Sequence, residues 1–104
     1  GCTLHLQTKD IPFHPEAYEF AEMGFIPSGA YRNREYAGPG VQAAAGVSRA
    51  MQDICYDPQT SGGLLIALPE KEAAQCLERL KDEIPEAAII GYVTEQEEAS
   101  VMME

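Results

Sequence analysis

The residue types best suited to chemistry gather in one short run, residues 56–65, which reads Tyr-Asp-Pro-Gln-Thr-Ser-Gly-Gly-Leu-Leu. An Asp-Pro pair starts a turn, and the hydroxyls of Thr60 and Ser61 can donate or accept hydrogen bonds. The paired glycines, Gly62 and Gly63, let the backbone approach another group closely. Successive N–H groups in such a turn can form an anion-binding concavity, so the run indicates a phosphate-binding turn.

The same run also fits an ordinary tight turn that enters a buried strand, with the glycines needed only for their dihedral angles. Composition alone favours this second interpretation, because glycine-rich turns are common. A Walker-type nucleotide loop is excluded, because Gly-x-x-x-x-Gly-Lys is absent and an apolar run, not a helix, follows the glycines.

A second group of polar residues, Arg32, Asn33 and Arg34, stands out because the chain is otherwise acidic. It lies in Phe25–Gly40, which is punctuated by Pro and Gly and has no clear periodicity, so we expect a long loop there. In a functional interpretation the loop faces a cleft, Asn33 bonds backbone or substrate, and the arginines bind phosphate. In the alternative, which the residues alone favour, Asn33 caps a turn and the arginines pair with surface acids.

Hydrophobic periodicity and the positions of Gly and Pro predict the elements that must hold these two segments. The strands are expected at Cys2–Leu6, Leu64–Leu68, Ala88–Val93 and Ser100–Met103, and the helices at Pro15–Gly24, within Val41–Cys55 and at Glu70–Ile84. We expect a buried strand at 64–68, an apolar stripe of the 70–84 helix in the core, and an antiparallel hairpin of the last two strands. This order implies the α/β fold class, with helices packed on a mixed β-sheet.

The composition bounds the function further. The 104 residues fit one domain, residues 1–104, and the net charge of −10 argues against a nucleic-acid partner. Residues 70–104 carry −7 of that charge, which indicates a solvated acidic face. The longest apolar runs are far shorter than the roughly 20 residues that span a bilayer, so we expect no membrane partner.

The metal and thiol chemistry of the sequence is sparse. Cys2, Cys55 and Cys76 form no Cys-x-x-Cys pair, and His5 and His14 are not spaced to complete a zinc site. We therefore assign no metal ligand, read the cysteines as reduced structural thiols of a cytoplasmic protein, and read both histidines as structural. His14 directly precedes the proline that opens the first expected helix, where it could serve as a cap.

Four segments together resemble one enzyme family. The run 57–65, Asp-Pro-Gln-Thr-Ser-Gly-Gly-Leu-Leu, closely resembles the signature in the C-terminal half of the selenophosphate synthetases (selenide, water dikinases), in the aminoimidazole-ribonucleotide-synthetase superfamily. Residues 24–33 look like that family's Gly-x-hydrophobic-Pro-x-Gly-x-x-x-Asn segment, and residues 15–24 resemble the preceding helix. Residues 87–93, Ala-Ala-Ile-Ile-Gly-Tyr-Val, resemble a strand near the family's C-terminus.

The resemblance implies the C-terminal domain of a two-domain enzyme that makes selenophosphate from selenide and ATP. ATP and Mg²⁺ would belong to the full enzyme, and no cofactor is expected in this chain. The reactive cysteine or selenocysteine would lie in an N-terminal ATP-binding domain, so Cys2 is not the catalytic residue and we assign none. That domain would be the partner, the full enzyme would be a homodimer, and this chain would be inactive alone. The resemblance puts the following candidates in a substrate-facing or phosphate-facing cleft: Asn33, Asp57, Gln59, Thr60, Ser61, Gly62 and Gly63.

Two other functions stay open. The acidic second half and the amphipathic 70–84 helix also fit a non-catalytic acidic binding or dimerisation module. A related kinase or amidotransferase domain of the same superfamily is a third candidate, although the Pro-Gln-Thr portion at residues 58–60 argues for the selenium enzyme.

Overall fold

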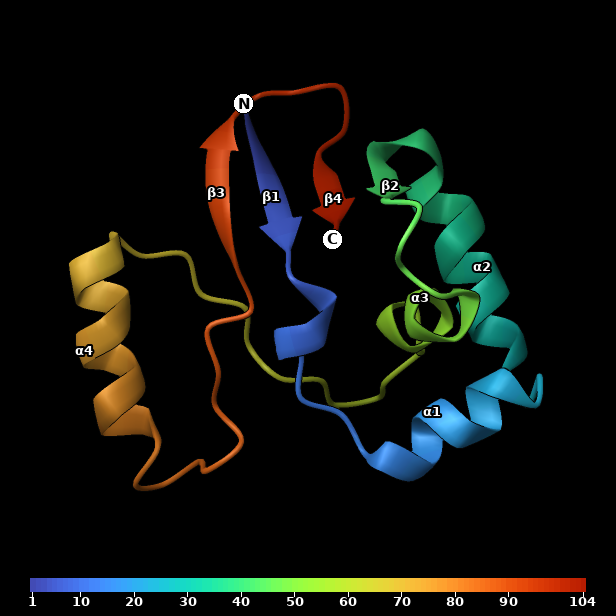
Figure 1. The fold of residues 1–104 in the computed structure, drawn as a ribbon, viewed down its shortest axis with the longest axis horizontal. Helices are drawn as coiled ribbons and strands as arrows, with labels where there is room; N and C mark the ends of the chain where they lie inside the picture. Colours follow the sequence, from blue (N-terminus) through green and yellow to red (C-terminus); the bar gives the residue numbers. More distant parts are fainter.

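The central element of the fold is the first strand, which lies inside a four-stranded mixed sheet of order β2-β4-β1-β3 (Figure 1). A computed structural model describes all residues from Gly1 to Glu104. The elements are β1 (Cys2–Leu6), α1 (Pro15–Glu22), α2 (Ser28–Ala37), β2 (Val41–Ala43), α3 (Arg49–Cys55), α4 (Glu70–Leu80), β3 (Gly91–Glu95) and β4 (Val101–Met103), with short 3-10 turns at Thr8–Asp10 and Gly38–Gly40. The α/β class and the mixed sheet predicted from the sequence are confirmed.

The predicted hairpin of the last two strands is wrong. The first strand separates them: β1 pairs antiparallel with β3 and parallel with β4, and β4 pairs in parallel with β2. Threonine and histidine side chains on β1 explain this preference, because both are buried and both bond residues of the 94–104 segment. Thr3 Oγ1 donates to the Ala99 carbonyl at 2.6 Å and accepts from the Glu97 N–H at 2.9 Å. These bonds draw the 96–100 turn over the end of β1.

Three helices lie beside the β2 edge of the sheet, and the apolar core sits between them and β4 (Figure 1). Its buried members are Val47, Met51 and Met103, with partly buried apolar side chains around them. The predicted first helix is confirmed as α1, which begins at Pro15 and is followed by Gly24 with a φ of +84°, a conformation that favours glycine. His14 occupies the N-cap position without a side-chain capping bond, so its suggested capping role is wrong.

The long loop predicted at Phe25–Gly40 is also wrong, because residues 28–37 form α2. The helix escaped notice because its inner face is made of small and charged residues. Ala30 is buried, while Arg34 and Ala37 are half-buried, and these three follow the i, i+4, i+7 spacing of one helix face. An apolar pattern search does not find a face built around an arginine.

The weaker helix predicted within Val41–Cys55 is correct only in its second half. The segment divides into β2 and α3 on either side of Gly46. Ser48 begins α3, since its Oγ accepts a 3.1 Å hydrogen bond from the Met51 N–H. The first half instead supplies a sheet edge, because Val41 and its neighbours pair in parallel with β4.

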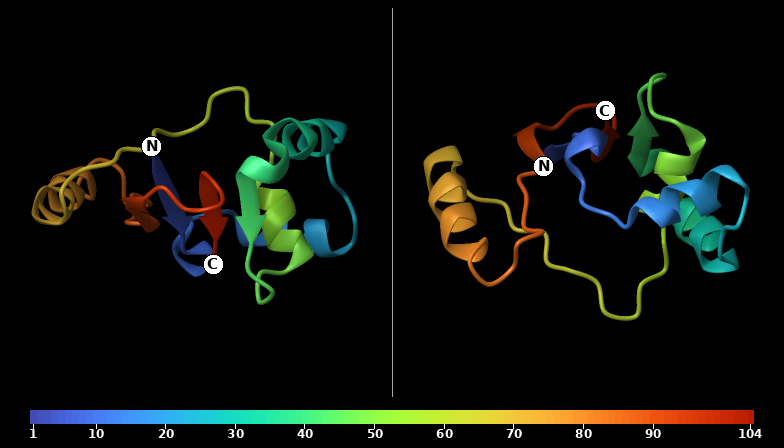
Figure 2. Two further views of the ribbon diagram at one scale, coloured as in Figure 1. Left: turned by 90° about the horizontal axis from the view of Figure 1, so that it is seen from above. Right: turned by 60° about the horizontal axis from the view of Figure 1, so that its bottom comes forward.

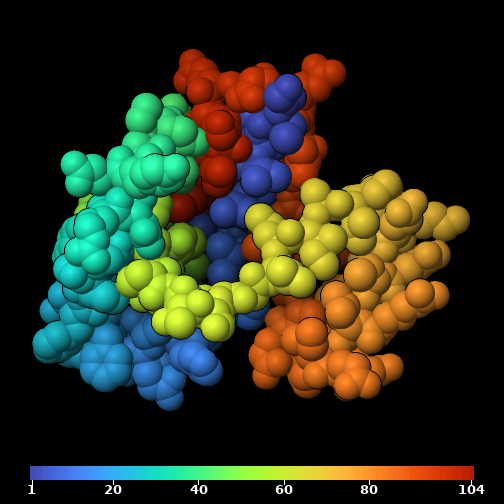
Figure 3. Space-filling model, turned by 180° about the vertical axis from the view of Figure 1, so that it is seen from behind, coloured from blue at the N-terminus to red at the C-terminus, as the bar shows by residue number.

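The predicted buried strand at Leu64–Leu68 is an exposed irregular connection. Leu64 is 91% exposed and Leu65 64%, and the segment pairs with no strand of the sheet. A strand is stabilised by its hydrogen-bonded neighbour and its packing, so an apolar sequence without either does not form one. Figure 3 shows this connection in yellow-green, crossing the surface toward α4.

The last helix, α4, stands at the β3 end of the molecule, away from the other helices (Figure 2). It ends at Leu80, short of the predicted Ile84, and none of its residues is buried. The predicted apolar stripe is real, because Ala73, Leu77 and Leu80 are among its less exposed residues, yet it does not enter a core. Residues 88–93 were predicted as a strand, and β3 begins only at Gly91.

None of these helices combines the length and the apolar character that crossing a bilayer requires.

Candidate functional site

The two segments that carry the sequence motifs lie against each other. Gly29 and Asn33 lie on the first turns of α2, and residues 56–63 follow the end of α3. A Cβ built on Gly29 would lie 2.7 Å from Cγ of Pro58 and 2.8 Å from its Cβ, so the proline ring packs directly on the helix backbone. Only glycine permits this close approach, which joins residues 24–33 to residues 57–65.

Asn33 holds the carbonyl group that precedes the candidate turn. Its Nδ2 donates a 2.9 Å hydrogen bond to the backbone oxygen of Tyr56, the C-cap residue of α3. The last carbonyls of a helix have no partner within the helix, so Asn33 supplies one. The interpretation of Asn33 as a turn cap therefore describes its contact in this structure. A contact of Asn33 with substrate stays a prediction.

Arg34 reinforces the same junction from the next position of α2. Its Nη2 lies 2.6 Å from Oδ1 of Asp53, whose side chain is only 8% exposed, and its guanidinium carbon lies 4.9 Å from the centroid of the Tyr56 ring. Arg49 approaches the same carboxylate oxygen at 3.3 Å from an exposed position. The predicted pairing of an arginine with an acid is thus found at Arg34, although its partner is buried. Arg32 instead donates to Ser28 Oγ at 3.3 Å.

The candidate residues share one property, which is exposure to solvent. The structure leaves all seven exposed: Asn33, Asp57, Gln59, Thr60, Ser61, Gly62 and Gly63. Residues 57–63 lie on the molecular surface in the space-filling view (Figure 3). Their side chains and backbone are therefore accessible to a ligand or to another part of a larger protein.

The paired glycines have no steric or conformational explanation within this chain. A Cβ on Gly63 would meet no atom within 4 Å, and one on Gly62 would meet only the Gln59 side chain, at 3.4 Å and beyond. Positive φ angles occur at Gly24 and Gly38, not at these two positions. The open backbone at Gly63 therefore leaves room for a close approach from outside the chain.

An open hollow of about 500 Å³ lies where α1, α2 and the start of α3 meet. Glu22, Tyr31, Arg49 and Asp53 are among its lining residues. None of the seven candidates lines it. The hollow therefore shares no residue with the exposed turn and does not complete the predicted site.

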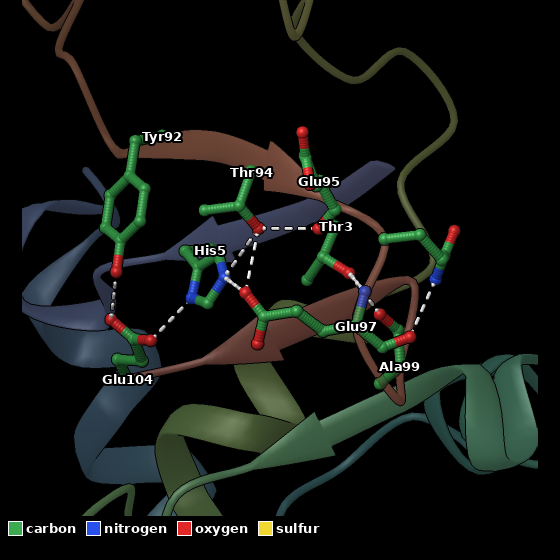
Figure 4. A network of polar contacts seen from close by, with 9 residues as sticks. Thr3, His5, Tyr92, Thr94, Glu95, Glu97, Ala99 and Glu104 are labelled. Atoms are coloured by element: carbon green, nitrogen blue, oxygen red, sulfur yellow. Dashed lines mark hydrogen bonds and ion pairs between the residues drawn. The ribbon is translucent and has the colours of Figure 1, made fainter. Parts of the chain in front are cut away.

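A second polar cluster surrounds His5 on β1 (Figure 4). Its Nδ1 lies 2.6 Å from Glu104 Oε1, its Nε2 lies 2.9 Å from Glu97 Oε1, and its ring stacks on Tyr92 with centroids 4.6 Å apart. The hydrogen bond with Glu104 is the main reason that the pKa of His5 lies above its ordinary 6.5. A hydrogen bond from Thr94, followed by one from His5, holds the pKa of Glu97 below its ordinary 4.5. This cluster ties the edge strand and the last residues to β1.

We expect this cluster to make stability depend on pH with a defined sign. Because folding raises the pKa of His5, its contribution is fully present below 6.5 and is lost as the pH rises through the folded-state pKa. Because folding lowers the pKa of Glu97, its contribution is present above 4.5 and is lost as the pH falls through the folded-state pKa. Both contributions are therefore complete between these two values.

Urea unfolding at about pH 5.5 and about pH 8.5 measures the His5 contribution. The wild type should lose more stability toward the higher pH than His5→Gln, which keeps polar side-chain groups but does not titrate. Equal losses in the two proteins would contradict the assignment.

The side chains that could bind a metal ion do not cluster, and the cysteines form no disulfide. No group of three or more His, Cys, Asp and Glu side chains is arranged to hold a metal ion. All three cysteines are free, and burial raises the pKa of Cys55, which disfavours its reactive thiolate form. Cys2 lies on β1, the strand predicted for it.

Sequence reasoning missed the residues that attach the turn to the fold. Asp53 carried a usable signal, since it is a lone acid among the apolar residues of a predicted helix segment, and such an acid needs a cationic partner. Gly29 was part of the quoted motif, but its contact with Pro58 follows only from the packing of α2.

Comparisons with known proteins agree with this arrangement. The family model described as AIR synthase related protein, C-terminal domain, matches residues 1–104. The chain is 46% identical over 105 residues to the selenide, water dikinase of Pelobacter propionicus, which covers 100% of this chain and 30% of that relative. It is 43% identical over 104 residues to selenide, water dikinase 2 of Peptoclostridium acidaminophilum, and this match covers 99% of this chain and 30% of that relative. A Clostridium botulinum selenide, water dikinase is 39% identical over 101 residues, and this match covers 97% of this chain and 29% of that relative.

The chain thus spans about 30% of the length of the curated relatives that it matches, and the matched part is their C-terminal portion. The resemblance predicted from the sequence is confirmed. By its sequence, its α/β fold and its match over residues 1–104, the chain belongs to the AIR synthase related protein C-terminal domain family and corresponds to the C-terminal portion of selenide, water dikinases.

Proposed function

We propose that this chain is the C-terminal domain of an ATP-dependent selenophosphate synthetase and that it is inactive alone. In the proposed reaction ATP, selenide and water give selenophosphate, phosphate and AMP, so each transferred phosphoryl group has an acceptor. The chain's share is to present the Asp57–Gly63 turn to the reacting phosphates. Names of relatives that cover this whole chain support the assignment.

One observation carries the role of the turn. Its glycine backbone at Gly63 is open on the outside, while its first residues are attached to α2 through Asn33 and Gly29. An attached but exposed turn with free N–H groups and hydroxyls suits phosphate oxygens, which accept hydrogen bonds. The turn carries no cation, so neutral donors would have to supply the binding.

The nucleotide and Mg²⁺ need residues beyond this chain. Mg²⁺ prefers carboxylate oxygens that converge on one point, and no acidic group here converges in that way. The donor set does not fit the ion, so no step through Mg²⁺ is assigned to this chain. We propose that the other 70% of a full-length protein holds the metal and the nucleotide. That part is also the proposed partner, in a homodimer located in the cytoplasm.

The exposed apolar connection after the turn supports a partner domain. Leu64, Leu65 and Ile66 are 91%, 64% and 55% exposed and follow the turn without a break. Contiguous exposed apolar side chains mark an interaction surface in a protein that remains soluble. We propose that the N-terminal portion of the full-length protein covers them and thereby brings its nucleotide to the turn.

Substitution of Gly63 in the full-length protein tests the proposal. Gly63→Val should lower the selenide-dependent release of AMP from ATP by at least roughly tenfold, because the side chain blocks a close approach from outside. Thr60→Ala should lower it less. The matched control is Gly46→Val, since both glycines have empty space around a Cβ and ordinary φ angles.

Full activity in both the Gly63 and Thr60 variants would show that the turn has no role in the reaction. Loss of activity in Gly46→Val as well would mean that valine acts through folding. Selenide-dependent activity of the isolated chain would contradict the proposed inactivity.

The alternative of an acidic dimerisation module is favoured by α4, whose apolar stripe contains no buried residue. Light scattering distinguishes the two functions. A tight dimer that Leu77→Glu dissociates, in a protein without selenide-dependent activity, would favour the module.

A further inference from the structure

The Asp57–Gly63 turn is attached to the fold at its beginning, and the attachment centres on one residue. Tyr56 precedes the turn, and α2 contacts it twice, through the backbone oxygen and through the aromatic ring. We infer that Arg34, which touches none of the proposed reacting groups, is a positioning residue for this turn; the inference rests on the proposed function of the turn.

The guanidinium of Arg34 joins two parts of α3 at once. It binds the carboxylate of Asp53, with Nη2 and Oδ1 2.6 Å apart, and its central carbon lies over the ring of Tyr56, 4.9 Å from the ring centroid. Asp53 is 8% exposed and the Arg34 side chain 23%, so water competes little for this ion pair. The ion pair therefore holds the guanidinium in place over the ring, and the guanidinium restricts the movement of the ring beneath it.

The Asp57–Gly63 turn starts where the backbone of Tyr56 leaves α3. The backbone N–H of Tyr56 donates to the Asp53 carbonyl at 3.2 Å, and the N–H of Asp57 donates to the Ile54 carbonyl at 3.1 Å. These bonds close the last turn of α3, and Arg34 covers that turn from outside. Releasing the ring frees both N–H groups, and with them the direction in which residues 57–63 leave the helix.

A lysine cannot replace this arginine in the proposed role. An ammonium group can pair with Asp53, but it has no planar face to stack on an aromatic ring and no fork of donors. Cation–π contacts of arginine contribute about 0.5–2 kcal/mol, which corresponds to roughly two- to thirtyfold in a local opening equilibrium. Arg34→Lys thus separates the ion pair with Asp53 from the cation–π contact with Tyr56.

The test uses the full-length protein and two measurements. Hydrogen exchange at the amides of Tyr56 and Asp57 should become about tenfold faster in Arg34→Lys and in Arg34→Met. Exchange at the β1 amide of Leu4, which is bonded to the Ser100 carbonyl, should stay unchanged and thereby report an intact fold. Arg32→Met is the matched control, because Arg32 is exposed and makes only the bond to Ser28.

The second measurement is a split between kcat and KM for the selenide-dependent reaction. A displaced turn should lower kcat about tenfold in Arg34→Lys while KM for ATP changes less than about twofold, since the nucleotide would be held by the other domain. Unchanged exchange at Tyr56 and Asp57 would overturn the inference, whatever the activity. Faster exchange in the Arg34 variants, combined with no selenide-dependent reaction in the wild type, would overturn the proposed function and leave the positioning of the turn standing. Faster exchange with unchanged kcat would show that the turn's position does not serve the reaction, which overturns the role given to Arg34.

Discussion

Gly91→Ala is expected to reduce the free energy of unfolding by about 3 kcal/mol, more than any other glycine-to-alanine change in the chain. The new Cβ would overlap the His5 carbonyl oxygen and lie 2.9 Å from the His5 carbonyl carbon and 3.2 Å from Leu6 Cα. These atoms belong to β1, which is held on one side by β3 and on the other by β4. A strand paired on both sides cannot retreat, so the β1–β3 ladder must separate where Leu6 pairs with Gly91.

Urea unfolding monitored by circular dichroism measures this loss. Gly46→Ala serves as the control, because no atom lies within 4 Å of its Cβ and its φ is not positive, so it should change stability by less than about 0.5 kcal/mol. Equal midpoints for the Gly91 and Gly46 variants would mean that β1 and β3 do not approach as closely as described.

The parts of the fold that local sequence dictates could be predicted. The strand at Cys2–Leu6 was found at its bounds, and the first helix was found because a proline opens it and Gly24 follows it with a positive φ. The helix that begins at Glu70 was also found, since its apolar and charged residues separate at helical spacing. In each case the signal lies within a dozen residues.

Strand order could not be predicted, because it depends on residues far apart in the chain. The polar turn at residues 95–98 is a good hairpin signal, but Thr3 and His5 bind that segment from a strand about ninety residues earlier. Likewise the apolar sequence of Leu64–Leu68 carries strand propensity, while burial and pairing are decided by the available neighbours.

The candidate site divides in the same way. The exposed turn could be predicted from residue types and from family resemblance, and its seven candidates await a test against substrate. What could not be predicted is how the turn is held, since Arg34 and Asp53 are nineteen positions apart and become partners only through the packing of α2 on α3. In the sequence Arg34 resembles the other surface arginines, and only the structure shows that its partner, Asp53, is buried.

Gly29→Ala is the second substitution with a large expected effect, because it acts on the contact between the two motif segments. Alanine is about 1 kcal/mol better than glycine within a helix, so α2 alone would be stabilised. The Pro58 ring atoms at 2.7 and 2.8 Å reverse that sign, and we expect a net loss of about 2 kcal/mol. Full-length Gly29→Ala should also lose activity, since the turn is pushed away from α2.

Comparison of four proteins separates this contact from other effects of the substitutions: the wild type, Gly29→Ala, Pro58→Gly and the double variant. Pro58→Gly removes both ring atoms that the new methyl group would meet, so in this background Gly29→Ala should be neutral or stabilising. If the alanine costs the same free energy in both backgrounds, the two motif segments are not in contact. A reversal of sign would instead demonstrate that glycine is needed at position 29 because residues 56–63 rest on α2. The family's two motif segments would then form one physical unit, in which the helix supplies the support and the turn supplies the exposed backbone.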